Sequence, residues 1–178
     1  MIPTELRLQS LLRAMLEVIL PAIDRSQQLA IDQANIMIGT LRILLDQNDK
    51  AYDFRMVELR QYAGQVRELL AIAEGGSETD AACRAAGAVL AQVGPIAALP
   101  IPSQAALTKS VLAIKTAADE LLRAAFADGN PNFRRAAGRL VVDHGGSELL
   151  RERVWVRRAG FEADPSKLPS MEDTLALD

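Results

Sequence analysis

The sequence predicts an all-α protein: a helical bundle of five to six helices with a long N-terminal helical hairpin and an extended C-terminal tail. Apolar residues recur every three or four positions over long stretches, which is the spacing of one face of a helix. Aromatic residues make up only 4% of the 178 residues, whereas hydrophobic residues make up 49%. Such an aliphatic core suits closely packed helices better than sheets. No stretch alternates apolar and polar residues for long enough to predict a strand.

The N-terminal quarter carries the longest apolar stripe. Thr4 can cap its first helix. The stripe comprises Leu12, Leu16, Ile19, Ile23, Ala30, Ala34, Met37, Leu41 and Leu44. Pro21 lies inside it, and a proline in a helix interior costs roughly 3 kcal/mol. Because the stripe keeps its phase, we expect one long helix kinked at Pro21; two helices that break near Pro21 are the alternative. A second helix over residues 51–73 would complete a hairpin with the first.

Three turn signals divide the rest of the chain into helices. They are a Gly-Gly pair before Ser77, a proline-rich stretch before Ser103 and the sequence Gly-Asn-Pro at residues 129–131. Ser77 and Ser103 are suitable capping residues. The helices predicted from these signals, and from the Gly-Gly pair discussed next, cover residues 79–93, 103–125, 131–142 and 147–158.

The only histidine of the chain lies in the sequence VVDHGGSELLRERVWVRR. Gly145 and Gly146 predict a hinge between two helices, with Ser147 capping the second. Asp143 is poorly placed to orient the His144 ring, because neighbours on a helix point about 100° apart. We therefore interpret His144 as part of a hinge; the alternative, in which it acts as an acid or base, makes it the one catalytic candidate.

The charges of the C-terminal part are divided between two segments. Residues 132–158 contain seven arginines and three acids, a balance of +4, whereas residues 159–178 contain five acids and one lysine, a balance of −4. We expect the acidic tail to lie along the basic helices, in its own subunit or a neighbour. The alternative is a phosphorylated ligand, because guanidinium groups pair bidentately with phosphate. The arginines proposed for binding are Arg134, Arg135, Arg139 and Arg151.

Composition and motifs exclude several classes of function. We expect a single domain over residues 1–158, followed by the tail over residues 159–178. The net charge of −3 argues against nucleic acid. The N-terminus lacks a secretory pattern, and Arg84 interrupts the most apolar run, so a soluble cytoplasmic protein without a membrane span is expected. One cysteine, one histidine and no glycine-rich phosphate loop predict no metal and no cofactor.

The run LLRAMLEVILPAIDRSQQLAIDQANIMIGTLRILL, about a quarter of the chain, resembles the opening of certain small all-helical bacterial proteins of unknown function. The matching residues are Leu20, Pro21, Ala22, Ala34 and Asn35. Such proteins are encoded beside acyl-CoA dehydrogenases and beside kinases resembling aminoglycoside phosphotransferases. No catalytic residues are assigned in that group. The resemblance therefore implies an accessory protein whose partner is an acyl-CoA-metabolising or kinase-like enzyme.

Isoleucines off the main stripe suggest an interface. They are Ile31, Ile36, Ile38 and Ile43. A helix that is apolar on several faces is buried on several sides, and Trp155 between arginines has the composition of an interface centre. We therefore predict a non-catalytic helical interaction protein, either a homo-oligomer or an accessory subunit of an enzyme complex. The alternative is a binder or enzyme for a phosphorylated or acyl-CoA-type ligand, which would use the C-terminal arginines and His144.

Overall fold

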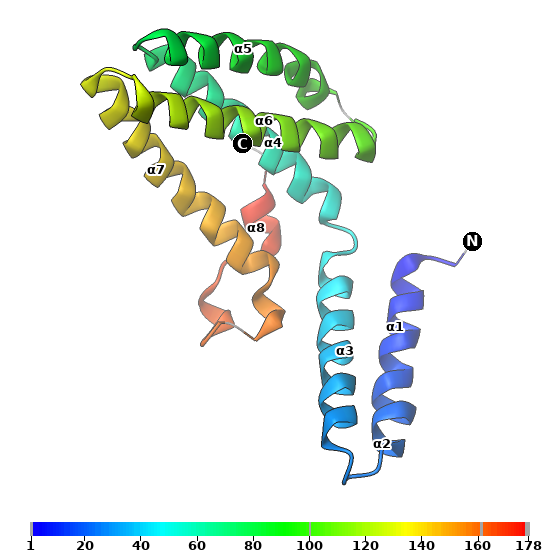
Figure 1. Ribbon diagram of the computed structural model, residues 1–178. Helices are drawn as coiled ribbons and strands as arrows, with labels where there is room; N and C mark the ends of the chain where they lie inside the picture. Colours follow the sequence, from blue (N-terminus) through cyan, green and yellow to red (C-terminus); the bar gives the residue numbers. More distant parts are fainter. Residues whose placement is uncertain (1, 100, 161, 177–178) are drawn as a thin grey trace. The chain divides into compact units, whose positions relative to one another are not determined.

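The computed structural model describes residues 2–99, 101–160 and 162–176, and within them all regular structure is helical (Figure 1). No strand forms in these residues; a single isolated bridge joins Gly75 and Gly129. The all-α class is therefore confirmed. The chain divides into two compact units, Met1–Ala51 with Arg151–Thr174 and Tyr52–Leu150 with Leu175–Asp178, and each unit is described on its own. The single domain over residues 1–158 and its tail stay predictions.

The first unit contains a hairpin of two antiparallel helices (Figure 1). Its elements are α1 (Thr4–Ala14), a π-helical turn η1 (Met15–Ile19), α2 (Leu20–Ala22) and α3 (Gln28–Gln47). The core between them is small. Its buried members are Met15, Ala34 and Ile38, and the partly buried apolar residues around them are Leu12, Leu20, Ile23 and Leu41.

The expectation of one long helix kinked at Pro21 is wrong, and the alternative of a break near Pro21 is correct. The proline ring crowds the carbonyl four residues earlier, that of Glu17. The helix widens at this point, and the N–H of Leu20 bonds to the carbonyl of Met15, five residues back. It ends at Ile23, whose ψ of 128° is extended. The hairpin therefore pairs α1 with α3, and the helix over residues 51–73 is not its second arm.

The turn of the hairpin is closed by Asp24. Its Oδ1 accepts hydrogen bonds from the backbone N–H and the hydroxyl of Ser26, both at 2.8 Å. An aspartate that bonds the backbone two residues later stabilises a tight turn. This local pattern at Asp24 and Ser26 was the signal for a reversal of the chain, and the sequence analysis missed it.

The C-terminal segment is not a simple extended tail. It forms two short 3-10 turns, η2 (Arg157–Ala159) and η3 (Pro165–Lys167), and a short helix α8 (Met171–Leu175). Side-chain caps account for the later elements: Asp164 accepts from the N–H of Ser166 at 3.2 Å, and the Ser170 hydroxyl oxygen accepts from the N–H of Asp173 at 3.0 Å. These polar residues therefore promote helical turns that the proline and acid content of the segment concealed.

Salt bridges in the first unit pair only part of the tail with the arginines. Glu162 binds Arg153 at 2.7 Å, as the charge balance predicted. Asp46 at the end of α3, however, pairs with Arg157 and Arg158 at 3.4 and 3.2 Å. Glu172 pairs with Lys50 at 3.2 Å, outside the basic segment.

The second unit packs four long helices around an aliphatic core. They are α4 (Ala51–Ile72), α5 (Ser77–Ala98), α6 (Gln104–Ala127) and the part of α7 (Pro131–Trp155) that belongs to this unit. Every helix contributes small or aliphatic residues, and among the described residues Phe133 is the one aromatic side chain in the buried cluster. The fully buried side chains of α4 and α6 include Leu59, Val66, Ile114 and Leu121.

The helix α5 is longer than predicted, because it continues through Pro95 to Ala98. By length and composition alone it could cross a membrane, a property that it shares with the core helices of many water-soluble proteins. The absence of a membrane span and the cytoplasmic location stay predictions.

The N-terminus of α5 is capped by Asp128 from the end of α6 and not by Ser77 as expected. The Asp128 carboxylate accepts hydrogen bonds from the N–H groups of Glu78 and Thr79, at 2.8 and 2.9 Å, and from the Thr79 hydroxyl at 2.6 Å. These bonds satisfy N–H groups that the helix itself leaves unpaired. They also lower the pKa of the Asp128 carboxyl, the Thr79 hydroxyl contributing most.

The turns before α5 and α7 lie against each other. The N–H of Gly76 bonds to the carbonyl of Asp128 at 3.1 Å, and the N–H of Asn130 bonds to that of Glu74 at 2.9 Å. Gly129 has no room for a side chain, since a Cβ there would lie against the carbonyl oxygen of Ala125 and 2.9 Å from its Cα. The glycine is therefore required by close approach of the backbone.

The hinge predicted at Gly145 and Gly146 is wrong, because α7 runs through both glycines as one helix. Each glycine in a helix interior costs only about 1 kcal/mol relative to alanine, and both flanking segments are helical. The Ser147 hydroxyl donates to the carbonyl of His144 at 2.9 Å and so does not cap a new helix. The fifth and sixth predicted helices are therefore one.

Candidate functional site

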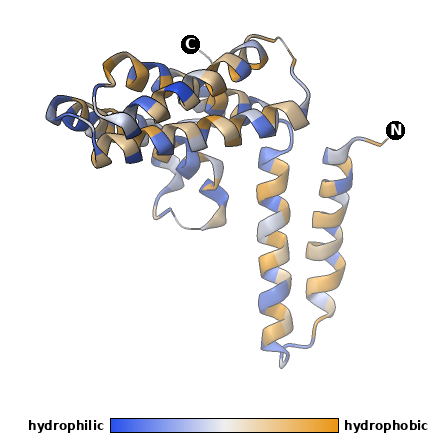
Figure 2. Ribbon diagram, turned by 45° about the horizontal axis from the view of Figure 1, so that its top comes forward, coloured by the Kyte–Doolittle hydropathy of each residue, from blue (hydrophilic) through white to orange (hydrophobic). Residues whose placement is uncertain are grey.

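An apolar groove runs along the hairpin of the first unit, between the α1–η1 arm and α3. It has a volume of about 370 Å³ and is lined by Leu11, Ala14, Met15, Ile19, Ile36, Met37, Thr40 and Leu41. Figure 2 shows hydrophobic positions along both arms of the hairpin. The polar side chain among these residues is that of Thr40, and its hydroxyl already donates to the carbonyl of Ile36 at 2.9 Å. The groove therefore offers apolar contact and hardly any hydrogen bonding.

Several large side chains of the groove are exposed to an unusual degree for apolar residues, although Met15 at its base is buried. Leu11 is 55% exposed, Ile36 60% and Met37 53%. A continuous apolar surface of this kind marks an interaction site more often than scattered exposed residues do. The walls of the groove therefore make it the leading candidate site for binding an apolar partner.

Charges on the hairpin are nearly balanced. Residues 2–47 contain four arginines and five acids. Several are satisfied along their own helix: Arg13 binds Glu17 at 2.9 Å, and Gln28 donates to Asp32 at 2.8 Å. The hairpin consequently carries no strong field that would repel a similar surface.

The five predicted interface residues do not form one surface. Ile36 is exposed in the groove, whereas Ile38 is 4% exposed and belongs to the hairpin core. Ile31 and Ile43 are partly buried and do not line the groove. Trp155 is partly buried too, and its carbonyl accepts a hydrogen bond from the Gln47 amide at 2.8 Å.

Sequence reasoning missed part of the groove because it favoured one long helix kinked at Pro21. Leu11 and Met15 were not singled out, while Ile19 and Met37 were assigned to the main apolar stripe and not to an interface. Ile19 is 45% exposed and Met37 53%. Only the reversal of the chain at Asp24 brings the two arms together around the groove.

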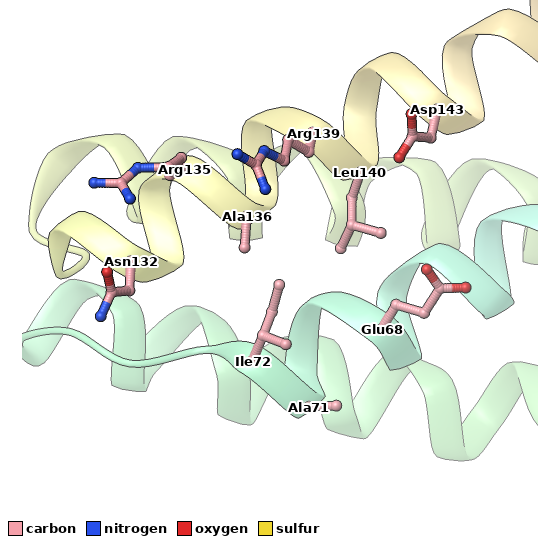
Figure 3. Close-up of a pocket in the computed structure, with 9 residues that line it drawn as sticks. All are labelled: Glu68, Ala71, Ile72, Asn132, Arg135, Ala136, Arg139, Leu140 and Asp143. Carbon is pink, nitrogen blue, oxygen red and sulfur yellow. The ribbon is translucent and has the colours of Figure 1, made fainter.

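A second cleft lies between α4 and the N-terminal half of α7 (Figure 3). It is about 570 Å³ in volume and is lined by Glu68, Ala71, Ile72, Asn132, Arg135, Ala136, Arg139, Leu140 and Asp143. The structure thus brings together two of the four arginines predicted to bind a ligand. Arg134 points elsewhere and donates to the carbonyl of Gly129 at 3.2 Å. Arg151 is buried and does not line this cleft.

The ring of His144 lies near a carboxylate, and the neighbouring Ser147 and Asp143 do not bond to it. Its Nε2 lies 3.4 Å from Glu68 Oε2, at the limit of a hydrogen bond. Ser147 bonds the His144 carbonyl and not its ring. A nucleophile activated by histidine requires a hydrogen bond from the nucleophile to the ring, and neither Ser147 nor Asp143 forms one.

A buried ionic network joins α4, α6 and α7 in the second unit. Glu58 is 1% exposed and pairs with Lys115 and with Arg55, whose Nη1 lies 2.6 Å from the carboxylate. Lys115 stands over the ring of Tyr62, 4.9 Å from its centroid. The Tyr62 hydroxyl donates to Glu148 at 2.7 Å. The sequence analysis did not single out Glu58, because it followed only the apolar residues of each helix.

The pKa shifts in this network are those of a stable ion pair. Burial alone would raise the pKa of Glu58, but the hydrogen bonds from Lys115 and Arg55 outweigh it and leave that pKa below its ordinary value. Burial and then the bond to the Glu148 carboxylate raise the pKa of Tyr62. Both shifts keep each group in its usual charge state at neutral pH, so the network suits packing better than proton transfer. In the described part of the chain, no group of three or more His, Cys, Asp or Glu residues is placed to hold a metal.

Fold and site together define an all-helical protein with an apolar groove on a hairpin. Comparison of the chain with protein-family models, with curated proteins and with solved structures found no match. The resemblance of the N-terminal quarter to accessory proteins stays an expectation.

Proposed function

We propose that this protein is a non-catalytic interaction protein that pairs with a second copy of itself through the hairpin groove. The observation that carries the proposal is the groove itself, in which four large apolar side chains are about half exposed: Leu11, Ile19, Ile36 and Met37. The near-neutral charge of the hairpin allows two copies to approach without strong repulsion.

The small core of the hairpin also supports a partner. Among the residues of the hairpin that the structure describes, only Met15, Ala34 and Ile38 are buried between its arms. Helices in proteins derive most of their stability from packing of an apolar face. Two antiparallel arms with a second apolar face form half of a four-helix bundle, and a two-fold axis would make the same patch serve both copies.

The apolar contribution of the groove is of the same order as the cost of association. Complete burial of a large apolar side chain contributes roughly 1.5–3 kcal/mol. For the half-exposed residues Leu11, Ile19, Ile36 and Met37, burial in both copies therefore contributes on the order of 6–12 kcal/mol. Association itself costs on the order of 4–15 kcal/mol, so we expect a dimer that dissociates on dilution.

The test is sedimentation velocity over a range of protein concentrations. We expect dimers of the wild-type chain that dissociate on dilution, and monomers for Ile36→Asp at every concentration. Leu112→Asp is the matched control, since Leu112 is 68% exposed on α6 in the second unit, and it should behave as wild type. Circular dichroism verifies that both variants remain helical.

Two outcomes would contradict the proposal. One is a wild-type chain that stays monomeric over the whole range; the other is a dimer that Ile36→Asp does not weaken. The accessory-subunit form of the hypothesis differs in one measurable respect, because the chain alone would then be monomeric and would dimerise only with an enzyme partner.

A further inference from the structure

The cleft between α4 and α7 has a polar rim above an apolar floor. Figure 3 shows Ile72 on α4 facing Ala136 and Leu140 on α7, with the arginine side chains along α7 above them. Its volume of about 570 Å³ lies within the usual range for small-molecule sites, which are mostly apolar with a few polar groups. Every lining residue belongs to the second unit.

The two arginines of the cleft are available to a ligand. Arg135 and Arg139 are four residues apart on one helix, which places them on the same face. In the described part of the chain neither forms a salt bridge, whereas Arg55 and Arg123 each bind a carboxylate within 3 Å. Two guanidinium groups side by side match the several oxygens of a phosphate or carboxylate.

The two ends of the cleft carry opposite charges. In Figure 3 the side chains of Asn132 and Arg135 lie at one end, those of Glu68 and Asp143 lie at the other, and Arg139 lies between them. Glu68 has its own neighbour in His144, at 3.4 Å. The acidic end repels a second negative charge, so the cleft favours a ligand with one anionic group.

We propose that this cleft binds a small organic phosphate or carboxylate, with its single anionic group at Arg135 and Arg139 and its apolar body on Ile72, Ala136 and Leu140. The Asn132 amide supplies further hydrogen-bond donors at the same end. This binding activity does not depend on the hairpin groove, because the cleft and the groove belong to different units.

The test is isothermal titration of the full chain with hexyl phosphate, hexanoate and inorganic phosphate. The proposal requires that hexyl phosphate bind at least tenfold more tightly than inorganic phosphate, because only the former uses the floor. Arg135→Gln and Arg139→Gln should each weaken binding of hexyl phosphate about tenfold or more, which corresponds to 1.4 kcal/mol and is near the lower limit for a hydrogen bond to a charged group. Asp143→Asn should tighten it several-fold by removing a repulsive charge.

Two further variants separate the head group from the floor. Ile72→Ser should weaken the binding of hexyl phosphate and leave the affinity for inorganic phosphate unchanged. Arg84→Gln is the charge-matched control, since Arg84 is exposed on α5 and does not line the cleft, and it should have no effect. The proposal would be overturned by the absence of hexyl phosphate binding up to millimolar concentration, by equal affinity for both phosphates, or by an equal loss in Arg84→Gln. Thermal unfolding of each variant excludes loss of the fold as the cause.

Discussion

Removal of the negative charge of Glu58 is expected to destabilise the second unit by about 2 kcal/mol. Breaking a buried ion pair by removing one partner commonly costs 3–5 kcal/mol, because the other charge stays buried. The cost is smaller here, since Arg55 and Lys115 retain 49% and 32% of their side-chain exposure and water screens them. Lys115 also keeps a second carboxylate, that of Glu148, at 3.8 Å.

The assay is urea unfolding followed by circular dichroism for Glu58→Gln, Lys115→Met and the double variant. We expect the double variant to lose less stability than the two single variants together, because removing both partners leaves no buried charge unpaired. Glu120→Gln is the control: Glu120 pairs with Arg123 while 51% exposed, so its loss should cost well under 1 kcal/mol. A loss below 0.5 kcal/mol for Glu58→Gln, or additive effects in the double variant, would refute the reasoning.

Two further predictions concern the turns and the interior of the second unit. Gly145→Ala and Gly146→Ala should each raise the free energy of unfolding by up to about 1 kcal/mol, since alanine favours the helix and no atom lies within 4 Å of the added Cβ. Gly129→Ala should lower the free energy of unfolding, because its Cβ meets the backbone. Urea unfolding measures all three variants. The folded state lowers the pKa of Asp128, so its contribution to stability is present above the unfolded pKa of about 3.9 and is lost as the pH falls through the folded value. Asp128→Asn should therefore be less stable than wild type at pH 6, and this difference should shrink as the pH is lowered below 4. A difference that stays constant with pH would assign the effect of Asp128 to something other than its charge.

Local signals in the sequence predicted the fold where capping decides the structure. Ser103 was expected to begin a helix, and its hydroxyl oxygen accepts from the N–H of Ala106 at 3.2 Å. Asn130 lies in the Gly-Asn-Pro turn signal that was expected to separate two helices, and its side chain caps α7 by accepting from the N–H of Phe133 at 2.7 Å. Both residues act within three positions of themselves, so the sequence alone was sufficient.

Features that depend on residues far apart in the chain could not be predicted in this way. The cap of α5 comes from Asp128, about fifty positions later in the chain, and nothing near Ser77 indicates it. The inward position of Glu58 depends on Lys115 from another helix. The glycine pair in α7 was misinterpreted as a hinge. Each glycine costs only about 1 kcal/mol in a helix interior, and α7 continues through both.

The candidate site, too, could be predicted from the sequence only in part. The composition of the hairpin predicted an apolar surface, but the identity of its residues depended on where the chain reverses. The two arginines of the cleft were identified from the sequence, whereas the apolar floor beneath them, with Ile72 from α4, required the tertiary structure.

The single wide turn at Met15–Ile19 has a consequence for how the groove is kept straight. In a regular helix, residues spaced by four overshoot a full turn by about 40°, so a line of such residues drifts around the axis. A π-helical turn holds more residues per turn, and it therefore reverses that drift between Met15 and Ile19. Leu11, Met15 and Ile19 can then stand in one row along the groove. Loss of one residue from this turn would restore regular helix and rotate Ile19 out of the row. The shape of the groove therefore depends on the length of this five-residue segment as well as on the apolar side chains.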